Sequence, residues 1–114
     1  MVIEKFEDII SWKKSKELIL FVYTAFKNNR DFSFKDQIQR AVISISNNIA
    51  EGFERKSNKE LKQFLYIAKG SCGEVRSMSY IALELQYISR TEFTRIYELS
   101  LEISKLFSGF IKTL

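Results

Sequence analysis

Hydrophobic residues recur along most of the chain at intervals of three, four and seven positions, which is the spacing of amphipathic helices. Short polar breaks interrupt this pattern, and no segment alternates between apolar and polar residues as a strand would. We predict an all-α chain with four helices, over residues 11–28, 34–55, 59–89 and 92–112. Short connections between such helices favour a single domain over residues 1–114, built as an antiparallel, up-down-up-down four-helix bundle.

Each predicted helix carries apolar series that define its core face. The third helix has two series with a seven-residue repeat, which form a seam of the coiled-coil kind. These are Leu61, Ala68, Val75 and Ala82, and Phe64, Ser71, Met78 and Leu85. The other helices contribute Trp12, Ile19, Val22 and Phe26; Phe34, Ile38, Ala41, Ile45, Ile49 and Gly52; and Phe93, Ile96, Ser100, Ile103, Phe107 and Phe110.

Local signals refine the ends and the packing of these helices. Ser57 and Glu60 have the spacing of a capping box before the third helix, and we expect Thr91 to cap the fourth. Gly70 and Gly73 lie in the middle of the third helix, where each costs about 1 kcal/mol relative to alanine. Two glycines at such a cost predict the close approach of another helix.

The composition argues against an enzyme. The chain has no histidine, which is the usual general base and the commonest metal ligand. Cys72 is the single cysteine, which excludes an internal disulfide and a cysteine-based zinc site, and we interpret it as a small buried hydrophobe. We expect no cofactor or metal. Acidic residues at the start of the chain do not fit a signal peptide, and the longest apolar run is far too short for a membrane span, so we expect a cytoplasmic protein without membrane contact.

Particular residues of the second and third helices resemble a known family. The second helix carries Arg40-Ala41, the run from Ser44 to Gly52 that ends in Asn-Ile-Ala-Glu-Gly, and Arg55. The third carries Glu60, Phe64-Leu65, the run from Ile67 to Ser71, and Glu74, and Phe6, Trp12 and Leu85-Gln86-Tyr87-Ile88 also fit. The chain resembles the proteins encoded within intervening sequences of bacterial 23S rRNA genes, to which accessory proteins of diversity-generating retroelements are similar. Ser46 stands where the family usually has proline.

The resemblance implies a left-handed four-helix bundle that assembles as a homopentamer without catalytic activity. The retroelement relatives bind a reverse transcriptase and nucleic acid through a basic surface, so these are the partners that the resemblance suggests. For the rRNA-encoded members, a role near RNA rests mainly on gene position.

The distribution of charge favours a nucleic-acid partner. The formal net charge is +4, and basic residues concentrate in two segments, 11–40 and 55–76. Lys62, Lys69 and Arg76 recur every seven residues and form one ridge of the third helix. The candidate nucleic-acid-binding residues are Lys13, Lys14, Lys16, Arg55, Lys56, Lys59, Lys62, Lys69 and Arg76.

Aromatic and apolar residues opposite the predicted core suggest assembly. A second ridge of the third helix comprises Tyr66, Gly73, Tyr80 and Tyr87, which suit either a subunit interface or stacking with bases. We favour the interface, with Tyr66, Tyr80, Leu83 and Tyr87 as its residues. Leu20, Phe21, Tyr23 and Ile81 are further apolar residues in excess of one core seam.

Four polar residues, Asn48, Glu51, Ser71 and Glu74, are predicted to form a structural polar core that fixes the helix register. The alternative for Asn48, Glu51 and Glu74 is a small-molecule or catalytic site. The function favoured by the sequence is a non-enzymatic homo-oligomer that binds RNA or DNA. The alternative is a protein-interaction scaffold, for example a reverse-transcriptase accessory subunit, without nucleic-acid binding of its own.

Overall fold

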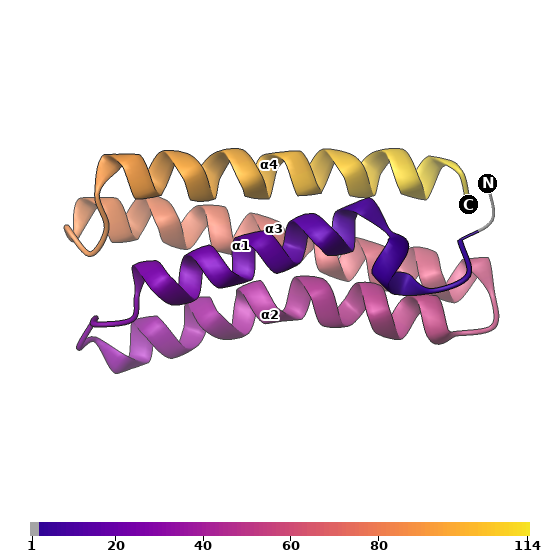
Figure 1. The fold of residues 1–114 in the computed structure, drawn as a ribbon, viewed down its shortest axis with the longest axis horizontal. Helices are drawn as coiled ribbons and strands as arrows, with labels where there is room; N and C mark the ends of the chain where they lie inside the picture. The colour runs from indigo at the N-terminus through magenta and orange to yellow at the C-terminus, as the bar shows by residue number, and fades with distance from the viewer. Residues whose placement is uncertain (1–2) are drawn as a thin grey trace.

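Four long helices account for most of residues 3–114, the part of the chain that the computed structural model describes (Figure 1). They are α1 (Ile10–Ala25), α2 (Phe32–Glu54), α3 (Asn58–Glu84) and α4 (Arg90–Lys112). A short 3-10 helix, η1 (Phe6–Asp8), precedes them, and residues 3–114 contain no strand. The all-α prediction with four helices is confirmed.

The helices pack as a bundle about one shared core. α1 packs on α2 and α4, and α3 packs on the same two helices, so α1 and α3 occupy opposite corners. Lys14 of α1 contacts Glu102, whereas Glu17, one turn later, contacts Arg95, an earlier residue of α4. These two helices therefore run antiparallel, and Figure 1 shows each helix returning beside the preceding one. The handedness of the bundle stays a prediction.

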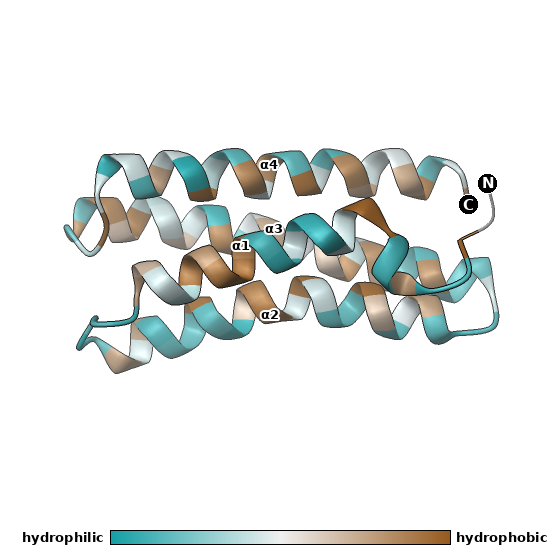
Figure 2. Cartoon of the chain, viewed as in Figure 1, coloured by the Kyte–Doolittle hydropathy of each residue, from teal (hydrophilic) through white to brown (hydrophobic). Residues whose placement is uncertain are grey.

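The core contains most of the apolar residues that the periodicity selected. All of the series from Ile38 to Gly52 in α2 is buried, and so are Leu61, Ala68, Val75 and Ala82 in α3. Trp12 and Ile19 lie only half-buried, because Leu18 and Val22 take the central positions of α1. Figure 2 shows a hydrophobic stretch in the second half of α1 and hydrophilic residues at the connections between helices.

The second predicted apolar series of α3, which runs from Phe64 to Leu85, is wrong at its last residue. Leu85 is 50% exposed, whereas Leu65, Cys72 and Ser79 are fully buried. In α3, three residues in every two turns face the two neighbouring helices. Two strict heptad series supply only two such residues, so the apolar face of α3 is wider than predicted.

The connection between α3 and α4 also differs from the prediction. α3 ends at Glu84 because Gln86 adopts a left-handed conformation, with φ of 61°, and the amide of Tyr87 donates back to the carbonyl of Ala82 at 2.8 Å. Ser89, not Thr91, caps α4. Its hydroxyl accepts from the amide of Glu92, whose carboxylate accepts from the amide of Ser89.

Gly52 marks a close approach of α2 and α3. A Cβ atom on Gly52 of α2 would lie 2.6 Å from Cβ of Phe64 on α3. At Gly70 a Cβ would meet nothing within 4 Å, and at Gly73 it would meet only the side chain of Arg76 at 3.8 Å. The expected close approach at Gly70 and Gly73 therefore does not occur among residues 3–114.

Candidate subunit and nucleic-acid interface

One side of α3 carries large apolar residues that the described chain leaves about half exposed. Tyr66, Ile67, Tyr80 and Ile81 are each about half exposed, between 49% and 56%. Gly70 lies between these two pairs on the helix surface. We call these five residues the outer face of α3. Large apolar side chains grouped in this way are typical of a partner surface.

The ring of Tyr80 on α3 turns toward α4. The ring of Tyr80 lies 5.0 Å from that of Phe93 and 6.0 Å from that of Tyr97, measured between ring centroids. Because residues seven apart share one side of a helix, Tyr66 lies on the same flank of α3 as Tyr80. Leu83, the other predicted interface residue on this helix, is half-buried.

Tyr87 does not continue this ridge, because α3 ends before it. Its ring packs edge-on against Phe34 with 5.4 Å between centroids, and its hydroxyl donates to the carboxylate of Asp31 at 2.7 Å. The hydrogen bond with Tyr87 is the main cause that lowers the pKa of Asp31, and the amide of Phe34 adds to it. The same bond raises the pKa of Tyr87. Tyr87 thus joins the two connections at one end of the bundle, and its expected place on an exposed ridge is wrong.

The basic ridge of α3, which comprises Lys62, Lys69 and Arg76, runs beside the tyrosines. All three side chains are half-buried, and none forms an ion pair with another residue in the range 3–114. Arg76 folds back along its own helix toward Gly73, and its Nη1 atom is buried without a hydrogen-bond partner among the described residues. A buried guanidinium nitrogen without an acceptor is costly to the folded chain.

The basic residues near the α2–α3 connection differ in their availability. Arg55 pairs with Glu51 at 3.1 Å and with Glu60 at 4.0 Å, and its guanidinium lies over the ring of Phe64 at 5.1 Å from the centroid. Lys56 and Lys59 are exposed and form no ion pair within the described chain. Only these two lysines are therefore free to extend the ridge of α3.

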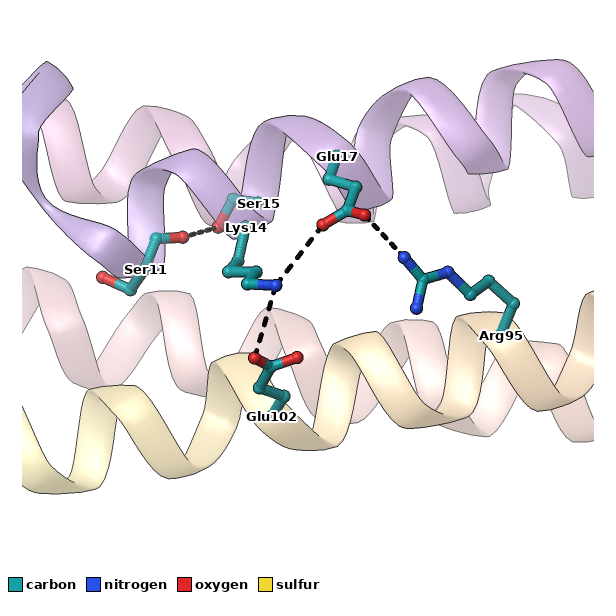
Figure 3. A network of polar contacts seen from close by, with 6 residues as sticks. All are labelled: Ser11, Lys14, Ser15, Glu17, Arg95 and Glu102. Carbon is teal, nitrogen blue, oxygen red and sulfur yellow. Dashed lines mark hydrogen bonds and ion pairs between the residues drawn. The ribbon is translucent and has the colours of Figure 1, made fainter.

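The basic residues of α1 lie apart from those of α3, since the two helices occupy opposite corners. Lys13 and Lys16 are exposed. Lys14 instead lies between Glu17 at 3.7 Å and Glu102 at 3.6 Å, and Arg95 of α4 completes this network by pairing with Glu17 (Figure 3). Acidic residues of the chain itself thus already compensate the charge of Lys14.

The predicted polar core exists only in part. Asn48 donates to the carbonyl and the hydroxyl of Ser44, and Ser71 donates to the same hydroxyl at 3.0 Å across the α2–α3 interface. Glu51 and Glu74 are exposed, so their assignment to the core is wrong. The residue that sequence reasoning missed is Ser44, which lies one helical turn before Asn48.

The thiol of Cys72 is buried and unreactive. Burial raises the pKa of the Cys72 thiol to about 12, which keeps it protonated at neutral pH. Residues 3–114 contain no group of carboxylates and thiols arranged to hold a metal ion. In the same part of the chain, every helix is too short or too polar to cross a membrane.

Comparison with known proteins identifies relatives of this four-helix bundle. Residues 7–109 match the family described as 23S rRNA-intervening sequence protein. The chain belongs to this family. A related crystal structure is that of a protein of unknown function from the S23 ribosomal protein family of Bacteroides thetaiotaomicron, with 27% identity and a TM-score of 0.85, over 90% of this chain and 99% of that one. A comparison with curated proteins found no match. Membership of the 23S rRNA-intervening sequence protein family confirms the resemblance and leaves the activity open.

Proposed function

We propose that the chain is a non-enzymatic homo-oligomer that binds RNA or DNA through basic ridges. The observation that carries this proposal is the pairing of two features on one flank of α3. Lys62, Lys69 and Arg76 have no acidic partner within the described chain, and exposed tyrosines lie beside them. Cations without acidic partners suit the phosphates of a nucleic acid, and exposed tyrosines suit a neighbouring subunit.

The spacing of the ridge fits an extended strand. Residues seven apart on a helix are about 10.5 Å apart, because the rise is 1.5 Å per residue. The cations can therefore contact phosphates at intervals along the strand, while Tyr66 and Tyr80 beside them remain available to the subunit interface. Lys56 and Lys59 extend the basic ridge toward the α2–α3 connection, and Lys13 and Lys16 form a second basic area on α1.

The outer face of α3 supports self-association. A Cβ at Gly70 would meet nothing within 4 Å, so packing within one chain does not explain why a residue that destabilises helices stands here. Another copy of the chain approaching at Gly70 would bury the four exposed apolar side chains. The family resemblance suggests five copies, and five copies would multiply a net charge of +4 into a strong positive field.

Fluorescence anisotropy with a structured RNA, a single strand and a DNA duplex tests the binding. We expect affinity to fall steeply with salt, because each neutralised phosphate adds about 0.7–0.9 to the slope of log affinity against log salt. The triple variant Lys59→Glu, Lys62→Glu and Lys69→Glu should bind at least a hundredfold more weakly.

A matched control separates this ridge from net charge alone. Lys5→Glu, Lys27→Glu and Lys112→Glu change the charge by the same amount, and all three residues are exposed and lie outside the proposed ridges. This control should keep most of the affinity. Equal loss in both triples would indicate unspecific charge attraction, and unchanged affinity in the first triple would contradict the proposed surface.

A protein partner is the second candidate, and one observation favours it. Leu20, Tyr23 and Phe32 are exposed by 59%, 40% and 71%, and they lie on α1 and at the start of α2, away from α3. A reverse transcriptase or another protein could dock there. Failure to bind any nucleic acid at low salt, together with a single partner recovered after nuclease treatment, would favour this scaffold role.

A further inference from the structure

An open groove runs along the contact between the second half of α1 and the first half of α2. Its volume is about 370 Å³, and Figure 2 shows this half of α1 as a hydrophobic stretch. We call it the α1–α2 groove, and its lining residues are Leu20, Tyr23, Thr24, Lys27, Lys35 and Gln39. None of these residues belongs to the basic ridge of α3 or to the candidate nucleic-acid-binding residues.

Apolar side chains in and beside the α1–α2 groove are left open to solvent. Leu20 and Tyr23, one turn apart on α1, are exposed by 59% and 40%. Phe32 is 71% exposed and lies one turn before Lys35, on the same side of α2. A nucleic acid would meet such residues mainly with phosphates and sugars, which give the aliphatic side chain of Leu20 little apolar surface to pack on. The groove therefore favours a protein partner that buries these side chains.

Lysines flank the apolar residues of the groove. Lys27 and Lys35 line it near the end of α1, and Lys16 lies one turn before Leu20 on the same side of that helix. The ammonium of Lys35 donates to the carbonyl of Lys27 at 3.0 Å, which holds it at the groove and leaves two of its three N–H donors for another acceptor. None of the three lysines forms an ion pair within residues 3–114.

The carboxylates of the neighbouring segments are engaged elsewhere. Asp36 of α2 pairs with Arg40 at 2.8 Å, and Glu17 of α1 pairs with Arg95 on the side of α1 that faces α4. Asp31 caps the N-terminus of α2. These are the acidic residues of α1, of the first half of α2 and of its cap, so the positive charge of the groove is left for a partner to neutralise.

We propose that the α1–α2 groove binds an acidic amphipathic helix of a partner protein. This inference rests on the second candidate function, which places a protein partner at these residues, and it adds the chemistry of that partner. Lys16 and Lys27 are 11 positions apart, or about 16 Å along α1, so a partner helix of about three turns spans them. Its apolar side would cover Leu20 and Tyr23, while carboxylates beside that apolar side pair with Lys27 and Lys35.

Selection from a library of helical peptides tests this chemistry. Each peptide has about 18 residues, or five turns, with leucine at every third or fourth position and random residues elsewhere. Selection on the native chain, with counter-selection on the double variant Lys27→Glu and Lys35→Glu, should enrich aspartate and glutamate at positions beside the leucines. Enrichment of neutral or basic peptides would overturn the acidic character of the partner. Recovery of no peptide that depends on the two lysines would overturn the site.

Matched variants separate the groove from net charge and from exposed apolar area in general. Fluorescence anisotropy with the most enriched peptide should show about tenfold weaker binding to the double lysine variant and to Leu20→Ser. Lys105→Glu with Lys112→Glu makes the same change in charge on exposed residues of α4, and Leu85→Ser removes a residue that is 50% exposed outside the groove. Both controls should keep the affinity, and melting curves confirm that every variant folds. Equal loss in the controls would contradict the groove.

Further measurements distinguish this inference from the functions proposed above. The triple variant of Lys59, Lys62 and Lys69 should keep peptide binding, and the double variant of Lys27 and Lys35 should keep RNA binding. Loss of binding to RNA, or to vesicles of phosphatidylglycerol, in the double variant would assign the groove to another class of partner and overturn the inference. A protein partner that needs Leu20 but docks without an acidic helix would also overturn it, while leaving the second candidate function intact.

Discussion

At the scale of single residues, Gly52 and Gly109 occupy opposite environments. Because a Cβ at Gly52 would lie 2.6 Å from Cβ of Phe64, Gly52→Ala must separate α2 from α3. We expect a loss of about 1–3 kcal/mol in the free energy of unfolding, measured by urea denaturation. Gly109→Ala is the control, since a Cβ there meets nothing within 4 Å and the change replaces a poor helix former outside the outer face of α3. A stability loss in both variants would contradict the assigned close approach.

The hydrogen bond between Tyr87 and Asp31 makes a second residue-level prediction, on pH. The pKa of Asp31 is lowered in the folded protein from its ordinary 3.8, mainly by Tyr87 and then by the amide of Phe34. Its contribution to stability is therefore fully present above the unfolded pKa and is lost as the pH falls through the lower, folded pKa. We expect Asp31→Asn to reduce the loss of stability below about pH 4.

Urea unfolding between pH 2.5 and pH 7 measures this effect. Tyr87→Phe should remove only part of the pH dependence that Asp31 causes, because the amide of Phe34 still donates to Asp31 at 3.1 Å. Asp36→Asn serves as the control, since Asp36 pairs with Arg40 on an exposed side of α2. An equal loss of stability at low pH in the native chain and in Asp31→Asn would refute the stabilising role of the Asp31 carboxylate.

At the scale of helices, the sequence predicted the number and approximate extent of the elements but not the end of α3. The heptad pattern continues through Leu85, and nothing in it signals that Gln86 turns to positive φ. The cap of α4 could have been found, because Ser89 and Glu92 repeat the spacing of Ser57 and Glu60. A third helix that continues to residue 89 hides this cap, because Thr91 is then the next residue that can cap α4.

The cap of α4 is directly testable. Ser89→Ala removes the acceptor for the amide of Glu92 and should destabilise the protein by about 1 kcal/mol. Thr91→Ala should change the free energy of unfolding by only about 0.3 kcal/mol, because Thr91 is exposed and lies inside the helix. Thermal unfolding of the two variants side by side distinguishes them, and a larger effect at Thr91 would restore the original assignment.

At the scale of the whole molecule, the candidate site includes contacts between helices that the sequence alone could not predict. The seven-residue repeat was enough to find the ridge of Lys62, Lys69 and Arg76. It could not show that Lys14 is held by Glu102, because that contact depends on which helix lies beside α1.

The proposed self-association through the outer face of α3 makes a prediction about stability and concentration. If folded chains assemble, dilution must lower the melting temperature, because assembly stabilises only the folded state. Gly70→Leu should improve the helix of the single chain yet prevent close approach of a neighbour. We therefore expect a variant that melts at the same temperature at every concentration and that sediments as a monomer.

Gly109→Leu provides the matched control for this experiment. A Cβ at Gly109 also meets nothing within 4 Å, but this residue is exposed on α4, away from the outer face of α3. It gains the same helix propensity and should keep the concentration dependence of the native chain. Analytical ultracentrifugation and melting curves over a hundredfold range of concentration make the comparison. Assembly that persists in Gly70→Leu would move the interface to another surface, and the exposed residues Leu20, Tyr23 and Phe32 would then be the next to substitute.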